Sequence, residues 1–123
     1  MLRPELTVLE QALHFNERNL EDHELKTILN RFIFPVESWP KLCGDLSGGE
    51  RMRLLLCCMQ IGQNLPDMII LDEPTNNLDI PTLDILTLSM KDYRGTLIVI
   101  SHDQYFLKEV GVKRKLRINL KMC

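Results

Sequence analysis

Two short, uninterrupted apolar segments constrain the fold of this chain more than any other feature. They occupy residues 68–71 (Met-Ile-Ile-Leu) and 96–100 (Thr-Leu-Ile-Val-Ile). Such runs are typical of strands that are covered on both faces of a parallel sheet. Between them, residues 81–93 have a helical pattern, with Pro81 in the first turn and Gly95 beyond the end. Strand, helix and strand at this spacing predict a βαβ unit with parallel strands and a right-handed crossover.

The residues ahead of these strands have the hydrophobic spacing of helices. Thr7 and Glu10 fit a capping box at the start of a helix over residues 7–15. A second helix is predicted over residues 21–32. Its buried stripe comprises Leu25, Ile28, Leu29 and Phe32.

A third helix is predicted over residues 47–60, because Gly62 and Pro66 follow it as breakers. Its expected buried face comprises Met52, Leu55, Leu56 and Met59, and Arg51 and Arg53 are expected to stay in solvent. After the second apolar run, the pattern predicts a short helix over 104–110 and an edge strand over 115–120.

Together these patterns predict an α/β fold in two parts. Residues 1–62 are expected to form a small helical subdomain, and residues 63–123 part of a parallel sheet with its helices. The sequence has no repeats and no low-complexity segment.

Composition excludes several classes of protein. The formal net charge of −2 gives no general reason to expect nucleic-acid binding. No apolar run is long enough to span a bilayer, and the first residues lack the pattern of a signal peptide. The four cysteines show no Cys-x-x-Cys pair, so reduced thiols in a cytoplasmic protein are expected.

Residues 46–50 (Leu-Ser-Gly-Gly-Glu) form the first candidate site. Ser47 and Glu50 fit a capping box at the start of the third helix, but two glycines in a first turn each cost about 1 kcal/mol relative to alanine. Without side chains, the free N–H groups of this turn can meet an anion such as phosphate. A plain helix start explains the same residues equally well.

Asp72 and Glu73 follow the first predicted strand directly, and this places two carboxylates at the carboxyl edge of the sheet. Adjacent strand residues point to opposite faces, so the two are expected to have different roles. Asp72 is assigned to Mg²⁺, and Glu73 to polarising an attacking water. The competing interpretation is a solvated acidic turn.

His102, in Ser101-His102-Asp103, follows the second predicted strand. An isolated histidine in a turn is more often structural than functional. Here both strand ends belong to one βαβ unit and should be neighbours, so His102 is expected to reach a phosphate or the water beside Glu73.

In order and spacing these motifs resemble those of the ATP-binding-cassette (ABC) ATPases. Residues 46–50 are similar to the signature loop, 69–73 to the Walker B strand with its catalytic glutamate, 76–79 to the D-loop and 101–103 to the H-switch. The residues of these motifs are most similar to those of the ABC-F proteins, which carry two cassettes and no membrane domain. Asn77 and Gln104 depart from the ABC-F pattern, which usually has histidine and arginine there.

The resemblance implies catalytic roles for Glu73 and His102, Mg²⁺ binding by Asp72, and ATP as the nucleotide. It implies further that cassettes pair head to tail, so that the signature of one covers the ATP of the other. The residues expected to contact nucleotide are Leu46, Ser47, Gly48, Gly49, Glu50 and Asp79. The family also implies action on the ribosome during translation.

The sequence contains no Gly-x-x-x-x-Gly-Lys-Ser/Thr, the phosphate-binding loop of such enzymes. The chain alone is therefore expected neither to bind ATP tightly nor to hydrolyse it. It is also expected to have exposed strand edges and one core face that no other element covers. Three alternatives stay open: a non-catalytic dimerisation module or inert remnant, the nucleotide-binding subunit of a transporter and, ranked last, an SMC-like ATPase. The basic residues 113–121 fit an RNA contact or, preferably, a lysine-protected edge strand.

Overall fold

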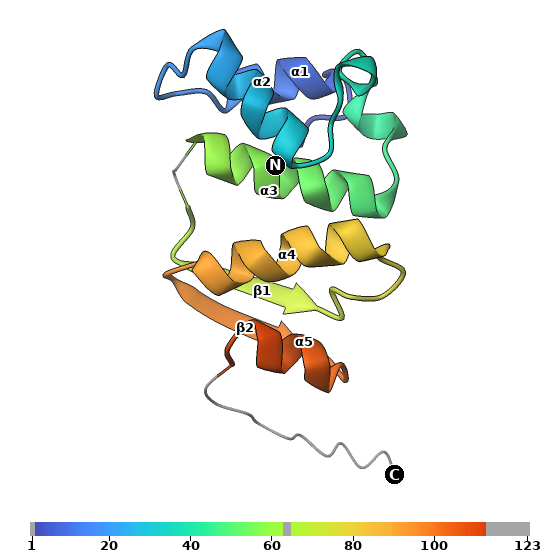
Figure 1. The fold of residues 1–123 in the computed structure, drawn as a ribbon, viewed down its shortest axis with the longest axis vertical. Coiled ribbons are helices and arrows are strands. Elements are labelled where there is room, and N and C mark those ends of the chain that lie inside the picture. The colour runs from blue at the N-terminus through green and yellow to red at the C-terminus, as the bar shows by residue number, and fades with distance from the viewer. Residues whose placement is uncertain (1, 63–64, 113–123) are drawn as a thin grey trace.

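A computed structural model describes residues 2–62 and 65–112 of the chain. Helices α1 (Val8–His14) and α2 (Asp22–Arg31) lie at one end of the molecule, and α3 (Gly48–Gly62) lies between them and the rest of the fold (Figure 1). Two 3-10 turns, Val36–Ser38 and Cys43–Asp45, lie in the proline-containing stretch between α2 and α3. None of the helices in the described ranges is long and apolar enough to cross a membrane.

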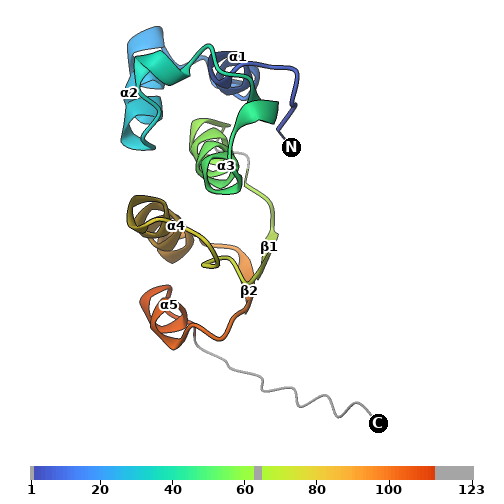
Figure 2. The same cartoon turned by 90° about the vertical axis from the view of Figure 1, so that its right-hand side faces the viewer.

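The other end of the molecule contains the predicted βαβ unit. Strands β1 (Met68–Asp72) and β2 (Thr96–Ile100) are parallel and flank α4 (Ile80–Asp92), and Asp72 is aligned with Ile100. Helix α5 (Gln104–Glu109) follows β2. Figure 2 shows α4 and α5 on the same side of the sheet. The α/β fold class and the parallel pairing are thus confirmed.

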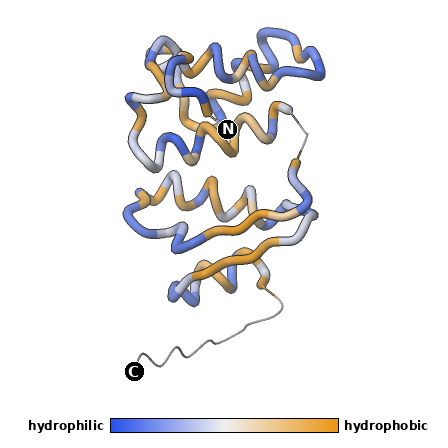
Figure 3. Tube along the Cα trace, turned by 180° about the vertical axis from the view of Figure 1, so that it is seen from behind, coloured by the Kyte–Doolittle hydropathy of each residue, from blue (hydrophilic) through white to orange (hydrophobic). Residues whose placement is uncertain are grey.

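The two strands are covered on one face only among the described residues, and the expectation of burial on both faces is wrong for them. The inward-facing residues Ile69, Leu71, Leu97 and Val99 pack against the core. The residues of the other face, Met68, Ile70, Ile98 and Ile100, are between 43% and 61% exposed. Figure 3 shows the hydrophobic segments of both strands side by side. The expected unfilled core face is therefore present.

Helices α1 and α2 follow the sequence closely. Thr7 Oγ1 accepts from the Glu10 backbone N–H at 3.1 Å, and Glu10 Oε1 accepts from the Thr7 N–H at 2.9 Å, so the capping box is confirmed. The predicted stripe of α2, with Leu25, Ile28, Leu29 and Phe32, is buried.

The predicted buried face of α3 needs correction. Its buried residues are Leu54, Leu56, Cys57, Cys58 and Ile61, whereas Leu55 is 39% exposed and Met52 and Met59 are partly exposed. The reason is that α3 lies between two layers and contacts α1 and α2 as well as α4. Cys57 and Cys58 are fully buried there. A single stripe therefore could not describe its buried surface.

Arg53 also departs from its predicted place in solvent. Its guanidinium lies over the Phe34 ring at 5.1 Å, and one of its terminal nitrogens donates to the carbonyls of Phe32 and Ile33. Arg51 is exposed, as expected. Because Arg53 holds the end of α2 against α3, its role is structural as well as electrostatic.

The three described cysteines are free thiols, as the sequence predicts. Burial raises the pKa of Cys57 beyond its usual range and the pKa of Cys58 to about 12. These thiols stay protonated and unreactive at neutral pH, because the thiolate is the nucleophile.

The division at residue 62 stays a prediction, because α3 packs against both parts. The expected edge strand 115–120 and the basic residues 113–121 lie outside the described residues.

Helix α2 ends in a strained conformation at Ile33. This β-branched residue has φ of +63°, and the Phe34 N–H donates back to Leu29 O at 2.9 Å, as in a Schellman motif. Glycine normally occupies this position because it has no Cβ. We expect Ile33→Gly to raise the free energy of unfolding by about 1 kcal/mol. Urea titration followed by Trp39 fluorescence measures the change, and a loss of stability would mean that Ile33 packing outweighs the backbone strain.

Candidate functional site

A cavity of about 560 Å³ lies between the N-terminus of α3 and the segment that follows β1. It unites three of the predicted motifs, since the 47–50 turn, the Asp72–Glu73 pair and residues 76–79 all line it. The remaining lining residues are Met52, Arg53, Pro74 and Thr82. Leu46, which was also assigned to nucleotide contact, is 4% exposed and belongs to the core.

The turn at the start of α3 is a reciprocal capping box. The Ser47 N–H donates to Glu50 Oε1 at 3.0 Å, and the Glu50 N–H donates to Ser47 Oγ at 3.2 Å. The hydrogen bond from the Ser47 backbone is the main cause that lowers the pKa of Glu50, and Lys41, 3.6 Å from its carboxylate, adds to it. Glu50 therefore stays ionised at neutral pH and holds the turn closed.

The two glycines of this turn are not required by packing within the chain. A Cβ at Gly48 would have no neighbour within 4 Å, and a Cβ at Gly49 would only touch Leu78 and Thr82 at ordinary distances of 3.5 and 3.8 Å. Glycine is less favourable than alanine in a helix, and packing within the chain does not require it here. The two glycines therefore indicate that a group outside the described residues approaches the backbone of this turn closely.

Asp72 and Glu73 both line the cavity, although adjacent strand residues are expected to face apart. Asp72 is the last residue of β1, whereas Glu73 adopts a left-handed φ of +47°. The Glu73 N–H still donates to Ile100 O at 2.7 Å, so the end of β2 anchors this turn. The left-handed turn interrupts the alternation and brings both carboxylates to one cavity.

His102 lies beside Glu73, as the position of the two strand ends predicts. Its Nε2 is 3.7 Å from Glu73 Oε1, and its side chain is fully exposed while that of Glu73 is 31% exposed. The histidine therefore reaches the outer side of the Glu73 carboxylate. It does not line the cavity itself.

The third motif, residues 76–79, follows Glu73 and also lines the cavity. Asn77 has φ of +61°, a conformation that asparagine tolerates better than most residues. Asp79 is the N-cap of α4, and its carboxylate caps no backbone N–H there. The Thr82 hydroxyl is the main cause that lowers the pKa of Asp79. The carboxylate therefore stays charged at the cavity wall.

Sequence reasoning missed Arg53 and Thr82 as members of this site. Arg53 is the one cation among the lining residues, which include four carboxylates. Its charge also lowers the pKa of two of them, Glu50 and Asp79. Arg53 follows Glu50 by three residues on the same helix, so the two side chains lie on one helix face. This spacing could have indicated that Arg53 belongs to the site. Thr82 is buried on α4 and had no such signal.

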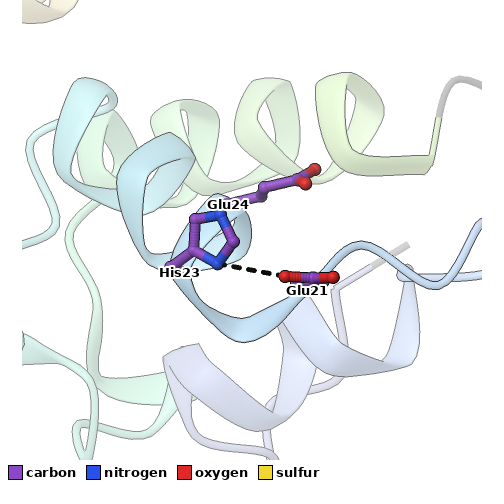
Figure 4. Close-up of side chains that lie close together, drawn as sticks. All are labelled: Glu21, His23 and Glu24. Atoms are coloured by element: carbon purple, nitrogen blue, oxygen red, sulfur yellow. Dashed lines mark ion pairs between the residues drawn. The ribbon is translucent and has the colours of Figure 1, made fainter.

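A second group of possible metal ligands lies at the start of α2. Glu21, His23 and Glu24 bring ligand atoms within 4.8 Å of one another, and His23 Nδ1 is 3.4 Å from Glu21 Oε2 (Figure 4). All three are exposed, and the positive end of the helix dipole opposes a cation there. The group is therefore explained as solvated surface residues.

Comparison with known proteins places the chain among nucleotide-binding cassettes. The ATP-binding protein Uup of Haemophilus influenzae is 39% identical over 116 residues, which cover 91% of this chain and 18% of that protein. The energy-dependent translational throttle protein EttA of the same organism is 37% identical over 110 residues, covering 89% of this chain and 19% of that protein. ABC transporter F family member 2 of Arabidopsis thaliana is 36% identical over 104 residues, 85% of this chain and 14% of that protein.

Solved structures share the fold. A dimeric ATP-binding cassette bound to ADP and phosphate is 26% identical with a TM-score of 0.57, covering 88% of this chain and 51% of that chain. An archaeal ribosome recycling factor has a TM-score of 0.59 at 22% identity, covering 86% of this chain and 21% of that chain. No family model matches the chain. The chain spans about a fifth or less of the curated relatives it matches.

Proposed function

The chain belongs to the ABC-F-like proteins of the ATP-binding-cassette family, and from this premise we propose that it is the water-activating and partner-facing portion of an ATP-hydrolysing cassette. In this proposal the complete protein couples ATP binding and hydrolysis to an action on the translating ribosome, in the cytoplasm. EttA, named as a translational throttle, supports the ribosome as partner.

The Glu73–His102 pair is the observation that supports hydrolysis most directly. Glu73 Oε1 and His102 Nε2 are 3.7 Å apart at the ends of adjacent strands. A carboxylate there can accept a proton from an attacking water. The imidazole of His102 is positioned to hold that water or the terminal phosphate. Neither residue is needed for the core, since both lie beyond the strands and are solvent-accessible.

Mg²⁺ fits the cavity better than a bare anion does. Four carboxylates and one guanidinium line it, so an unaccompanied triphosphate would meet repulsion. Oxygen ligands are those that Mg²⁺ prefers, and Asp72, exposed at the end of β1, would hold the ion directly or through water. When bound, Mg²⁺ neutralises charge on the phosphates.

The phosphate cradle must come from residues other than these 123, because they contain no Gly-x-x-x-x-Gly-Lys. We therefore propose that Asp72, Glu73 and His102 act on a nucleotide held by such a loop of the same cassette. The open space over Gly48 supports the proposal that the 47–50 turn contacts a different nucleotide from the one on which Asp72, Glu73 and His102 act. In the proposed head-to-tail pair it covers the nucleotide of a second cassette, which its free N–H groups and helix dipole favour.

A complementation experiment tests the partner-facing role. The chain is titrated against the complete protein in which the glycine equivalent to Gly48 of each cassette is replaced by aspartate. We expect the wild-type chain to restore part of the lost ATP hydrolysis, because it supplies an intact turn in trans. Phosphate release measures the effect.

Gly48→Ala in the added chain is the matched control. Its methyl group enters open space within the chain, so folding is preserved, but it stands where a phosphate would approach. We expect this variant chain to restore at most about one tenth of the ATP hydrolysis that the wild-type chain restores. Equal rescue by both chains, or none by either, contradicts the trans role and favours an inert segment.

A further inference from the structure

A second, apolar groove lies at the other half of α3. Its volume is about 370 Å³, and its floor is formed by the C-terminal half of α3. The end of α2 forms one wall and α4 the other. Figure 2 shows both of these helices on the same side of α3. The groove is therefore a trough between three helices of the described chain.

The floor of the groove is apolar and its upper wall is exposed. Phe32, Leu56 and Met90 lie at the bottom and are at least nine-tenths buried. Leu88 stands on the α4 wall with 62% of its surface exposed. The partly exposed Met59 can adapt to an incoming side chain because its chain is unbranched. Such a surface gains free energy when apolar side chains cover it.

The rim of the groove is charged and polar, with opposite signs on the two walls. Arg31 lies on the α2 wall and Asp92 on the α4 wall, and Gln60 and Ser89 complete the rim. Neither Arg31 nor Asp92 forms an ion pair within the described residues. An apolar centre inside a polar rim is typical of an interface with a separate partner rather than of a domain interior. The unpaired charges favour a partner with an acid along one flank and a base along the other.

We propose that this groove is a docking site for an amphipathic α-helix of another protein. The helix places a row of aliphatic side chains on Leu56, Met59 and Leu88, in the helix-in-groove mode. A carboxylate on one flank pairs with Arg31, and a lysine or arginine on the other pairs with Asp92. No step of this proposal depends on nucleotide.

The groove and the nucleotide-facing cavity use opposite halves of α3. On α3, the cavity is lined by residues of the first two turns, from Gly48 to Arg53 without Arg51, whereas the groove is lined by Leu56, Met59 and Gln60. The two sets of residues are disjoint, so a helix in the groove leaves the 47–50 turn free.

The test uses a synthetic helix as probe. An 18-residue fluorescein-labelled peptide carries leucines at helical i, i+3, i+4 and i+7 spacing, glutamates on one flank and lysines on the other. We expect saturable binding to the 123-residue chain in fluorescence anisotropy. Leu88→Glu should weaken the dissociation constant about tenfold or more, because it places an acid on the apolar face. Arg31→Glu should weaken it about threefold to tenfold, an effect that salt reduces.

Three controls make the outcome decisive. Ile80→Glu alters an apolar residue of α4 that is 73% exposed and does not line the groove, and it should bind within about twofold of wild type. Circular dichroism checks that each variant folds, which the exposure of Leu88 and Ile80 makes expected. A peptide with two central prolines cannot form the helix and should not bind. Equal binding by the proline peptide, an unchanged Leu88→Glu variant, an equal loss in Ile80→Glu, or no binding to the wild-type chain would each overturn the proposal.

Discussion

Replacing Glu73 with glutamine is expected to lower the kcat of ATP hydrolysis by the complete protein about 10²- to 10³-fold. The amide has almost the same shape but cannot accept a proton from the attacking water, and general-base catalysis contributes effects of this size. ATP binding should persist, because Glu73 lies at the end of β1 beside His102 rather than in a phosphate cradle. Single-turnover kinetics and equilibrium nucleotide binding measure the two quantities separately.

The effect of Glu73→Gln on kcat is best compared with the effect of His102→Ala. His102 approaches the Glu73 carboxylate from the solvent side, with its own side chain fully exposed. We expect about a tenfold loss of kcat, smaller than for Glu73, because a positioning group is easier to replace with water. A Glu73→Gln protein that keeps wild-type turnover would remove Glu73 as the base, whatever His102 does.

Gly95→Ala is expected to lower the free energy of unfolding by roughly 1–3 kcal/mol, the usual cost of overpacking. A Cβ at this position would lie 2.8 Å from the backbone carbonyl of Asp67 and would overlap the Tyr93 hydroxyl. That hydroxyl donates to the Pro66 carbonyl, and the Thr96 N–H donates to Asp67 O at 2.9 Å. The added methyl must therefore displace the start of both strands. Urea unfolding followed by circular dichroism measures the loss.

Gly48→Ala is the matched substitution with the opposite expected sign. Its methyl group meets nothing within 4 Å, and alanine is the better helix former at the start of α3. We expect the free energy of unfolding to rise by up to about 1 kcal/mol. If Gly95→Ala were as stable as wild type, the tight turn between α4 and β2 would have to be more compliant than its contacts indicate.

Features that depend on residues close together in the sequence were predicted correctly, whereas several features that depend on packing between distant segments were not. The capping boxes at Thr7 and Ser47 were predictable because each involves a residue and its neighbour three positions on. The buried face of α3 was not predictable in the same way. It packs between two layers, so Cys57 and Cys58 are buried while Leu55 is exposed. Hydrophobic spacing assumes one buried face, and this helix has two.

The proposed chemistry of the site follows from the sequence itself. Two strands in a βαβ unit must end at the same edge, and this alone placed Glu73 and His102 together. Only the tertiary structure decided that Asp72 and Glu73 share a cavity, because the left-handed turn at Glu73 reverses the alternation of a strand. It also decided that Arg53 and Thr82 line that cavity, since the packing of α3 on α4 is a long-range event that no local pattern encodes. Residue type and spacing specify which groups are available, and packing between distant segments specifies which of them meet.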